Sequence, residues 1–185
     1  MSNLTAMKEI LIETPPRTIM EVYKSLPTGT LAELIDNIIY MSPSPISKHQ
    51  VILNKINVQL YTHLEKNNLG MVYLAPLDVY LDEKSNAVQP DLSVVLNGGK
   101  ARVDENGFIQ GVPDLIVEIL STGNREYNLV KKKELYQRFG VKEYWVVDPD
   151  TKLTQGFQLQ KGKYNLISDQ TGKMESPLLV ANFLF

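Results

Sequence analysis

Residues 113–148, PDLIVEILSTGNREYNLVKKKELYQRFGVKEYWVVD, predict a strand, a helix and a second strand in succession. Residues 115–120 are apolar and mostly β-branched except at one position, as expected for a strand buried on both faces. The helix spans residues 128–139 and ends at Gly140, which suits the left-handed position that follows many helices. Residues 143–147 form the second strand. Because a helical crossover joins parallel strands, we expect the two strands to be parallel neighbours in one sheet.

Two charged residues lie where this pattern predicts core. Glu118 interrupts the first strand, and burying a carboxylate without a partner costs several kcal/mol. On a helical wheel at about 100° per residue, with Leu129 at zero, Lys132 falls at about 300°. This angle lies between Phe139 at about 280° and Tyr136 at about 340°. Lys132 therefore points toward the core, and we expect it to meet Glu118.

Composition limits the class of protein. The chain has 185 residues with 43% apolar content, enough for one domain with its own core. Its net charge of −2 argues against attraction of nucleic acid by the whole surface, although a local basic cleft is compatible with it. The absence of cysteine excludes disulfides and thiolate metal sites. The sequence shows neither a signal-peptide pattern nor a membrane span of about 20 apolar residues, so we expect a soluble cytoplasmic protein.

Periodicity along the rest of the chain predicts a mixed α/β domain. We expect an N-terminal leader or arm over residues 1–27 and a single domain over residues 28–185. The leader holds a short helix near residues 19–25 or serves as an arm on a partner subunit. Residues 97–111 read as a polar loop, mobile or acting as a lid. The other expected elements are a hairpin at 31–41 that turns at Asp36-Asn37, a helix at 46–66, strands at 71–81 and 88–96, a hairpin at 153–159 and 163–167, and an apolar closing segment at 178–185.

Three acidic residues lie in or beside apolar strands: Glu33 in LAELI, Asp91 in QPDLSVV and Glu118 in LIVEIL. Two carboxylates on adjacent strands repel each other unless a divalent cation separates them, and Mg²⁺ prefers one or two carboxylates with water and phosphate oxygens. A nearby lysine such as Lys132 orients or deprotonates the attacking water and stabilises charge on a phosphate. This set suits metal-assisted phosphodiester hydrolysis, with Asp91 and Glu118 as metal ligands.

A structural interpretation of the same residues stays open. Glu118 and Lys132 can form an ion pair with no catalytic role. Lys132 can also extend its ammonium to the surface along its apolar stem. Asp91 follows a proline and can serve as a turn former.

Several segments together resemble the Uma-type restriction endonuclease family, a member of the PD-(D/E)xK nuclease superfamily. The resemblance extends from about residue 27 to the C-terminal hairpin. It implies a restriction-endonuclease-like core, α/β in the mixed α+β sense, with a mixed central sheet flanked by helices. It also implies a Mg²⁺-dependent nuclease site at one end of that sheet. The segments that carry it are QPDLSVV, PDLIVEILS, the helix with Lys132 and Tyr136, and GVKEYWVVDP.

The resemblance also assigns roles to residues. Asp91 matches the metal-binding aspartate that follows a proline, and Glu118 matches the acid of the (D/E)xK element. The lysine of that element is absent at Leu120, and in this family it stands on the following helix, at Lys132. Glu33 matches an early acid that aids metal or water positioning.

Other matches and departures concern residues outside this core. His49 matches a histidine of the first long helix, and its role stays open between a site residue and a residue at the helix surface. Asn128 stands where members often carry aspartate. The hairpin turn has Asp36-Asn37 in place of Asp-Gly and still tolerates left-handed conformations.

The sequence therefore predicts an endonuclease that hydrolyses DNA with Mg²⁺, or Mn²⁺ in its place, through catalytic residues Glu33, Asp91, Glu118 and Lys132. Because an enzyme that cuts both strands of two-fold symmetric DNA needs two active sites, we expect a homodimer. Two alternatives stay open: a catalytically inactive nuclease-fold module that binds DNA or protein, favoured by the acidic charge, and a structural dimer in which Glu118 and Lys132 are only an ion pair. The sequence does not decide between DNA and RNA.

Overall fold

The computed structural model describes residues 15–121 and 127–185. In this part of the chain, strands form a six-stranded central sheet, a second six-stranded sheet and a two-stranded hairpin. The central sheet has the order β12 (Lys163–Thr171), β11 (Leu153–Gln160), β10 (Glu143–Val147), β9 (Leu115–Ile119), β6 (Leu92–Leu96) and β3 (Gly70–Leu74). The second sheet has the order β2 (Ile38–Met41), β1 (Ala32–Ile35), β5 (Ala87–Val88), β4 (Val79–Tyr80), β8 (Ile109–Gln110) and β7 (Arg102–Val103). The mixed α+β class predicted from the sequence is confirmed.

The parallel pair at the centre is β9 and β10, in a register that places Glu118 beside Val146. The segment that joins them begins as a π-helix, η1 (Tyr127–Lys132), and continues as α3 (Lys133–Phe139). Gly140 ends α3 in the left-handed conformation, with φ 88°. The predicted strand–helix–strand unit and its glycine stop are therefore confirmed, but the first turns are π-helical where an α-helix was expected. Such turns occur frequently at functional sites.

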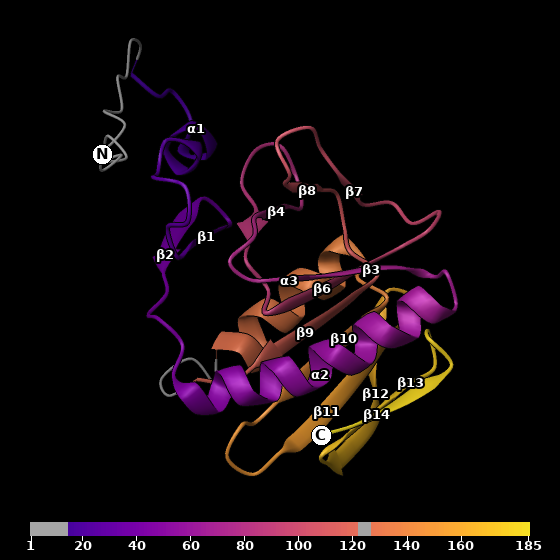
Figure 1. Cartoon of the computed structure of the whole chain (residues 1–185). Coiled ribbons are helices and arrows are strands. Elements are labelled where there is room, and N and C mark those ends of the chain that lie inside the picture. Colours follow the sequence, from indigo (N-terminus) through magenta and orange to yellow (C-terminus); the bar gives the residue numbers. More distant parts are fainter. Residues whose placement is uncertain (1–14, 122–126) are drawn as a thin grey trace, which may run out of the picture.

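Helices cover both faces of the central sheet (Figure 1). The long helix α2 (Ser47–Lys66) buries one face of its surface against β9 and β10 through residues such as Ile56 and Leu60. The other face of the sheet packs against α3 through Tyr136, Tyr144 and their neighbours. The C-terminal hairpin, β13 (Lys173–Ser176) and β14 (Ala181–Leu184), extends the core under α2. Side-chain alternation in β9 thus sends successive residues to opposite layers.

The helix expected near residues 19–25 is α1 (Ile19–Lys24). Thr18 and Glu21 form a capping box at its start, which satisfies backbone N–H groups that the helix leaves unpaired. Met20 and Tyr23 are buried against β1, β4 and β5. This part of the predicted leader therefore contributes to a packed cluster, and residues 1–14 lie outside the described residues.

Several predicted boundaries are wrong, for reasons that involve proline and strand length. The strand expected at 71–81 divides at Pro76 into β3 and β4, and the strand expected at 88–96 divides at Pro90 into β5 and β6. Proline has no N–H for the ladder, and in both cases the two halves enter different sheets. The loop expected at 97–111 contains β7 and β8, whose two-residue strands are too short to show a period. The closing segment expected at 178–185 contains β14, which pairs with β13 in a hairpin.

The hairpin of β1 and β2 forms as expected. Asp36 and Asn37 form its turn with φ values of 50° and 65°. The hairpin of β11 and β12 also forms. No helix in residues 15–121 and 127–185 has both the length and the hydropathy of a membrane-spanning segment.

Candidate active site

The sheet topology brings Asp91 and Glu118 to one face of the central sheet. In the antiparallel pair of β6 and β9, Leu92 lies beside Val117. One further step along both strands places Asp91 opposite Glu118. Since Leu92 and Val117 face α2, alternation directs both acids to the face that α3 covers. The backbone N–H of Ile119 donates to Asp91 Oδ2 at 2.7 Å, which fixes the carboxylate at the strand end.

Lys132 enters this face from the last residue of η1. Its Nζ lies 2.8 Å from Glu118 Oε1 and 2.9 Å from Glu33 Oε1. All three side chains are buried, with Lys132 5% exposed. The helical wheel thus predicted the direction of Lys132 correctly. Its partners are two carboxylates, where the sequence indicated only Glu118.

Glu33 reaches the site from β1 in the second sheet. Its Oε1 also accepts a hydrogen bond of 2.9 Å from the backbone N–H of Gln89. Gln89 belongs to the connection between β5 and β6, two residues before Asp91. Sequence reasoning missed Gln89 because a backbone N–H contact leaves no side-chain signature.

His49 lies beside Asp91, near the start of α2. Its Nε2 lies 3.1 Å from Asp91 Oδ2. Within the described residues, its buried Nδ1 has no hydrogen-bond partner. Burial lowers the pKa of His49, but the hydrogen bond and negative charge of Asp91 outweigh it and raise that pKa above its ordinary value. His49 therefore holds the Asp91 carboxylate in its orientation.

Tyr136 is a further site residue, which the sequence indicated only as part of the family motif. Its hydroxyl donates to Glu118 Oε1 at 2.8 Å, and its side chain is fully buried. Burial, with the charges of Glu118 and Glu33, raises its pKa well above the ordinary value, so it remains a donor. The signal for it was present: Tyr136 follows Lys132 by four residues, one turn along the same helix face.

When Glu118 is ionised, the cluster holds more negative than positive charge. Burial raises the pKa of Glu118 to about 7; the charges of Asp91 and Glu33 add to this, and the charge of Lys132 opposes it. Burial lowers the pKa of Lys132, but Glu118 and Glu33 outweigh burial and raise it, so Lys132 stays charged. The carboxylates of Glu33, Asp91 and Glu118 thus share one ammonium and one imidazole. Such a cluster attracts a further cation.

A cavity of about 150 Å³ opens over this cluster and is lined by Glu33, His49, Asp91, Glu118 and Lys132 together with residues 42–45. Within the described residues, Asp91 Oδ1 and Glu118 Oε2 accept no hydrogen bond. Two oxygens from adjacent strands are therefore available to a hard cation. No cluster of three or more His, Asp or Glu residues in the described part of the chain forms a ready-made metal site. Mg²⁺, however, takes one or two carboxylates and completes its shell with water and phosphate oxygens, so the residues present fit it.

The departure from the family pattern at Asn128 concerns a side chain that the structure does not describe. Asp36, in the hairpin turn, lies away from the cluster and forms an ion pair with Arg138 at 2.6 Å. Glu33, Asp91, Glu118 and Lys132 are thus all brought together, and His49 joins them.

Comparison with known proteins supports the fold and identifies the family. The model of the Uma2 family, described as "Putative restriction endonuclease", matches residues 20–183. A crystal structure described as "a putative nuclease belonging to DUF820", from Anabaena variabilis, has the same fold. It is 23% identical, with a TM-score of 0.71, and the match covers 89% of this chain and 92% of that chain. No curated protein matches the sequence. With the family match spanning nearly the whole described chain, the protein belongs to the Uma2 family.

Proposed function

We propose that the protein is a Mg²⁺-dependent endonuclease that hydrolyses phosphodiester bonds in DNA. The observation that carries the proposal is the buried ammonium of Lys132 beside the paired acids Asp91 and Glu118, under a cavity open to substrate. Membership of a family described as restriction endonucleases supports nuclease chemistry. Metal dependence, DNA as substrate and the roles of individual residues are part of the proposal.

Asp91 and Glu118 would hold the metal ion through the oxygens that accept no hydrogen bond in the described residues. When bound, a divalent ion supplies positive charge against the phosphate and makes coordinated water more acidic. A bound ion would also offset the repulsion between the two carboxylates, which adds to the effect of burial in raising the pKa of Glu118.

Lys132 acts as a charged hydrogen-bond donor in this proposal. Because its pKa is raised, it is not a base at neutral pH. Glu33 holds the ammonium at 2.9 Å and keeps it in place when Glu118 turns its charge toward a cation. A fixed ammonium in a buried site orients the attacking water and stabilises negative charge on the phosphate, and such preorganised charge is a large contribution to catalysis.

His49 and Tyr136 position the two metal-binding acids. His49 contacts the Asp91 oxygen that also accepts from Ile119, so the other oxygen stays directed to the cavity. Tyr136 similarly donates to the oxygen of Glu118 that Lys132 contacts. Groups that orient metal ligands in this way strengthen metal binding.

Nicking of supercoiled plasmid DNA tests the proposal. The wild type should nick DNA with Mg²⁺ or Mn²⁺ and not with EDTA, and Lys132→Ala should reduce the rate at least a hundredfold. Lys133→Ala is the matched control, since Lys133 is the next residue and its Nζ lies over the Phe157 ring, away from the acids. Removing Lys132 leaves two buried carboxylates without their ammonium. Lys132→Met, which keeps an apolar side chain at this position, is therefore measured in parallel. Thermal unfolding checks that each variant is folded.

Equal nicking by Lys132→Ala and the wild type would contradict the assigned role. The second candidate function is a catalytically inactive module that binds DNA or protein, favoured by the net charge of −2. Absence of both nicking and Mn²⁺ binding by calorimetry would favour that module.

We also propose a homodimer, because cleavage of both strands of two-fold DNA takes two sites. Light scattering of the purified protein measures its mass directly. A monomer at concentrations that support double-strand cleavage would contradict this part.

A further inference from the structure

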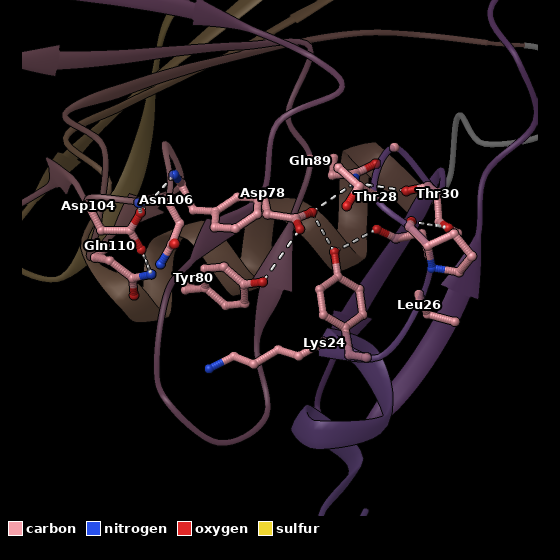
Figure 2. Close-up of a pocket in the computed structure, with 15 residues that line it drawn as sticks. Lys24, Leu26, Thr28, Thr30, Asp78, Tyr80, Gln89, Asp104, Asn106 and Gln110 are labelled. Carbon is pink, nitrogen blue, oxygen red and sulfur yellow. Dashed lines mark hydrogen bonds between the residues drawn. The ribbon is translucent and has the colours of Figure 1, made fainter. Parts of the chain in front are cut away.

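A second cavity, of about 270 Å³, lies across β1 from the cluster of Glu33, Asp91, Glu118 and Lys132, here called the acid–lysine site. Figure 2 shows the residues that line this second cavity. Thr30 and Ala32 line this cavity, whereas Glu33 lines the cavity of the acid–lysine site. Since neighbouring strand residues point to opposite faces, β1 separates the two spaces. Cavities for drug-sized ligands begin at roughly 300 Å³, so this one has room for a single heterocycle.

Aromatic rings form one wall of the cavity. Tyr80 contacts Tyr23 at 6.4 Å and Phe108 at 5.8 Å between ring centres, at interplanar angles of 85° and 86°. Tyr23 and Tyr80 are buried, and Phe108 is partly exposed. The ammonium of Lys24 lies 5.1 Å from the centre of the Tyr80 ring. Flat aromatic surfaces of this kind are those on which nucleobases stack.

Polar groups line the two ends of the cavity. Asp78 Oδ1 accepts from the Tyr23 hydroxyl and from Gln89 Nε2, both at 2.8 Å. Within the part of the chain that the structure describes, its Oδ2 has only a long contact of 3.5 Å with the Tyr80 hydroxyl, so it keeps capacity to accept a stronger bond. At the other end, the side-chain amide of Asn106 makes no hydrogen bond within the described residues. Figure 2 shows the Tyr80 ring between Asp78 and the group of Asp104, Asn106 and Gln110.

The charge of the cavity selects among ligands. Asp78 and Asp104 face one ammonium, that of Lys24, so a phosphate group is not favoured inside. A neutral heterocycle with N–H donors suits a carboxylate acceptor. Guanine, cytosine and adenine carry exocyclic amino groups. Unpaired thymine offers a carboxylate only its N3–H, which lies between two carbonyl oxygens that a carboxylate repels.

We propose that this cavity binds an unpaired nucleobase that carries an amino group, stacked on Phe108 and hydrogen-bonded to Asp78. The choice of a nucleobase rests on the proposed function, in which nucleic acid is the substrate. Gln89 connects the two sites: its Nε2 donates to Asp78 and to Thr30 O, while its backbone N–H donates to Glu33. A base bound at Asp78 is therefore linked through one further hydrogen bond to Gln89, the residue whose backbone N–H holds Glu33.

Binding measurements on the full-length protein in EDTA test the proposal without cleavage or metal. Guanosine, cytidine, adenosine and thymidine are titrated by calorimetry, as are a single-stranded oligonucleotide and the same strand with abasic positions. We expect the amino-bearing nucleosides to bind more tightly than thymidine. Phe108→Ala should weaken binding about tenfold or more, from the usual strength of base stacking. Asn106→Ala, at an exposed position, should weaken it several-fold without a folding risk, and Tyr61→Ala, at an exposed aromatic on α2, should have no effect.

The separate titrations distinguish the source of the base. If free nucleosides bind and Phe108→Ala weakens that binding, the site is open to free ligand. If the intact strand binds but free nucleosides do not, and if binding is lost in the abasic strand and in Phe108→Ala, the base is presented by the nucleic-acid substrate. Any one of three results overturns the proposal. The first is equal binding of the intact and abasic strands together with no binding of nucleosides. The second is unchanged binding by Phe108→Ala, and the third is binding of thymidine as tight as that of guanosine. Nucleoside binding by a protein that neither nicks DNA nor binds Mn²⁺ would contradict only the proposed function.

Discussion

The stability of the metal-free protein should depend on pH through Glu118. Burial raises the pKa of Glu118 from 4.5 to about 7 in the folded protein. Between these values the folded state holds a proton that the unfolded state has released. The free energy of unfolding therefore falls as the pH rises through this window and levels off above pH 7. A pKa change from 4.5 to about 7 corresponds to roughly 3 kcal/mol.

Glu118→Gln isolates this contribution, because the amide has the same shape and does not titrate. Its oxygen can still accept from Lys132 and Tyr136. Relative to the wild type, the variant should gain stability by about 3 kcal/mol between pH 4 and pH 8. Titrating groups that the charge of Glu118 does not influence cancel in the difference. His49, whose pKa is also raised, loses its stabilising contribution as the pH rises through its folded pKa, in the same direction as Glu118.

Urea unfolding in EDTA at a series of pH values measures the difference. Millimolar Mn²⁺ at pH 8 should then stabilise the wild type, since a ligand that binds only the folded state adds to stability, and should stabilise Glu118→Gln far less. A stability difference that stays constant within about 0.5 kcal/mol from pH 4 to pH 8 would refute the reasoning that burial holds a proton on Glu118.

Three further predictions concern other parts of the molecule. His49→Ala should lower Mn²⁺ affinity at least tenfold by calorimetry, since His49 orients Asp91; an unchanged affinity would contradict that role. Glu143→Ala should lower the free energy of unfolding, measured by chemical denaturation, by about 3 kcal/mol. The reason is that Glu143 is fully buried and accepts hydrogen bonds from Trp145 Nε1, the Ser176 hydroxyl and the Leu178 N–H. A loss below about 1 kcal/mol would count against this role of Glu143. Gly156→Ala should cost about 1–3 kcal/mol by overpacking, since its Cβ would lie 2.4 Å from the Trp145 ring; an unchanged melting temperature would show that the ring moves freely.

The sequence was most informative where a charge interrupts an apolar period. Glu118 in an otherwise apolar run and Lys132 on the inward side of a helix are costly to bury unless they meet, and the structure places them 2.8 Å apart. The parallel pairing of β9 and β10 followed from the short helical crossover. These inferences used only local periodicity and a general rule of handed connections.

What the sequence did not show depends on contacts between distant segments or on single backbone groups. Several strands of the second sheet, such as β5, β4 and β8, are only two residues long. Strands this short show no alternation of apolar and polar residues in the sequence. The π-helical start at η1 has a sequence that is compatible with an α-helix. Gln89 holds Glu33 through its backbone N–H, a group that every residue except proline has. Tyr136 could have been found, because it shares a helix face with Lys132.

Anomalous scattering from crystals soaked in Mn²⁺ tests the central claim most directly. The proposed nuclease chemistry depends on one cation held jointly by Asp91 and Glu118, beside the ammonium of Lys132. We expect an anomalous peak bonded to an oxygen of each carboxylate in the wild type and no peak there in Asp91→Asn. Crystals that hold no ion between these residues, at a Mn²⁺ concentration at which the same protein nicks DNA, would contradict the account.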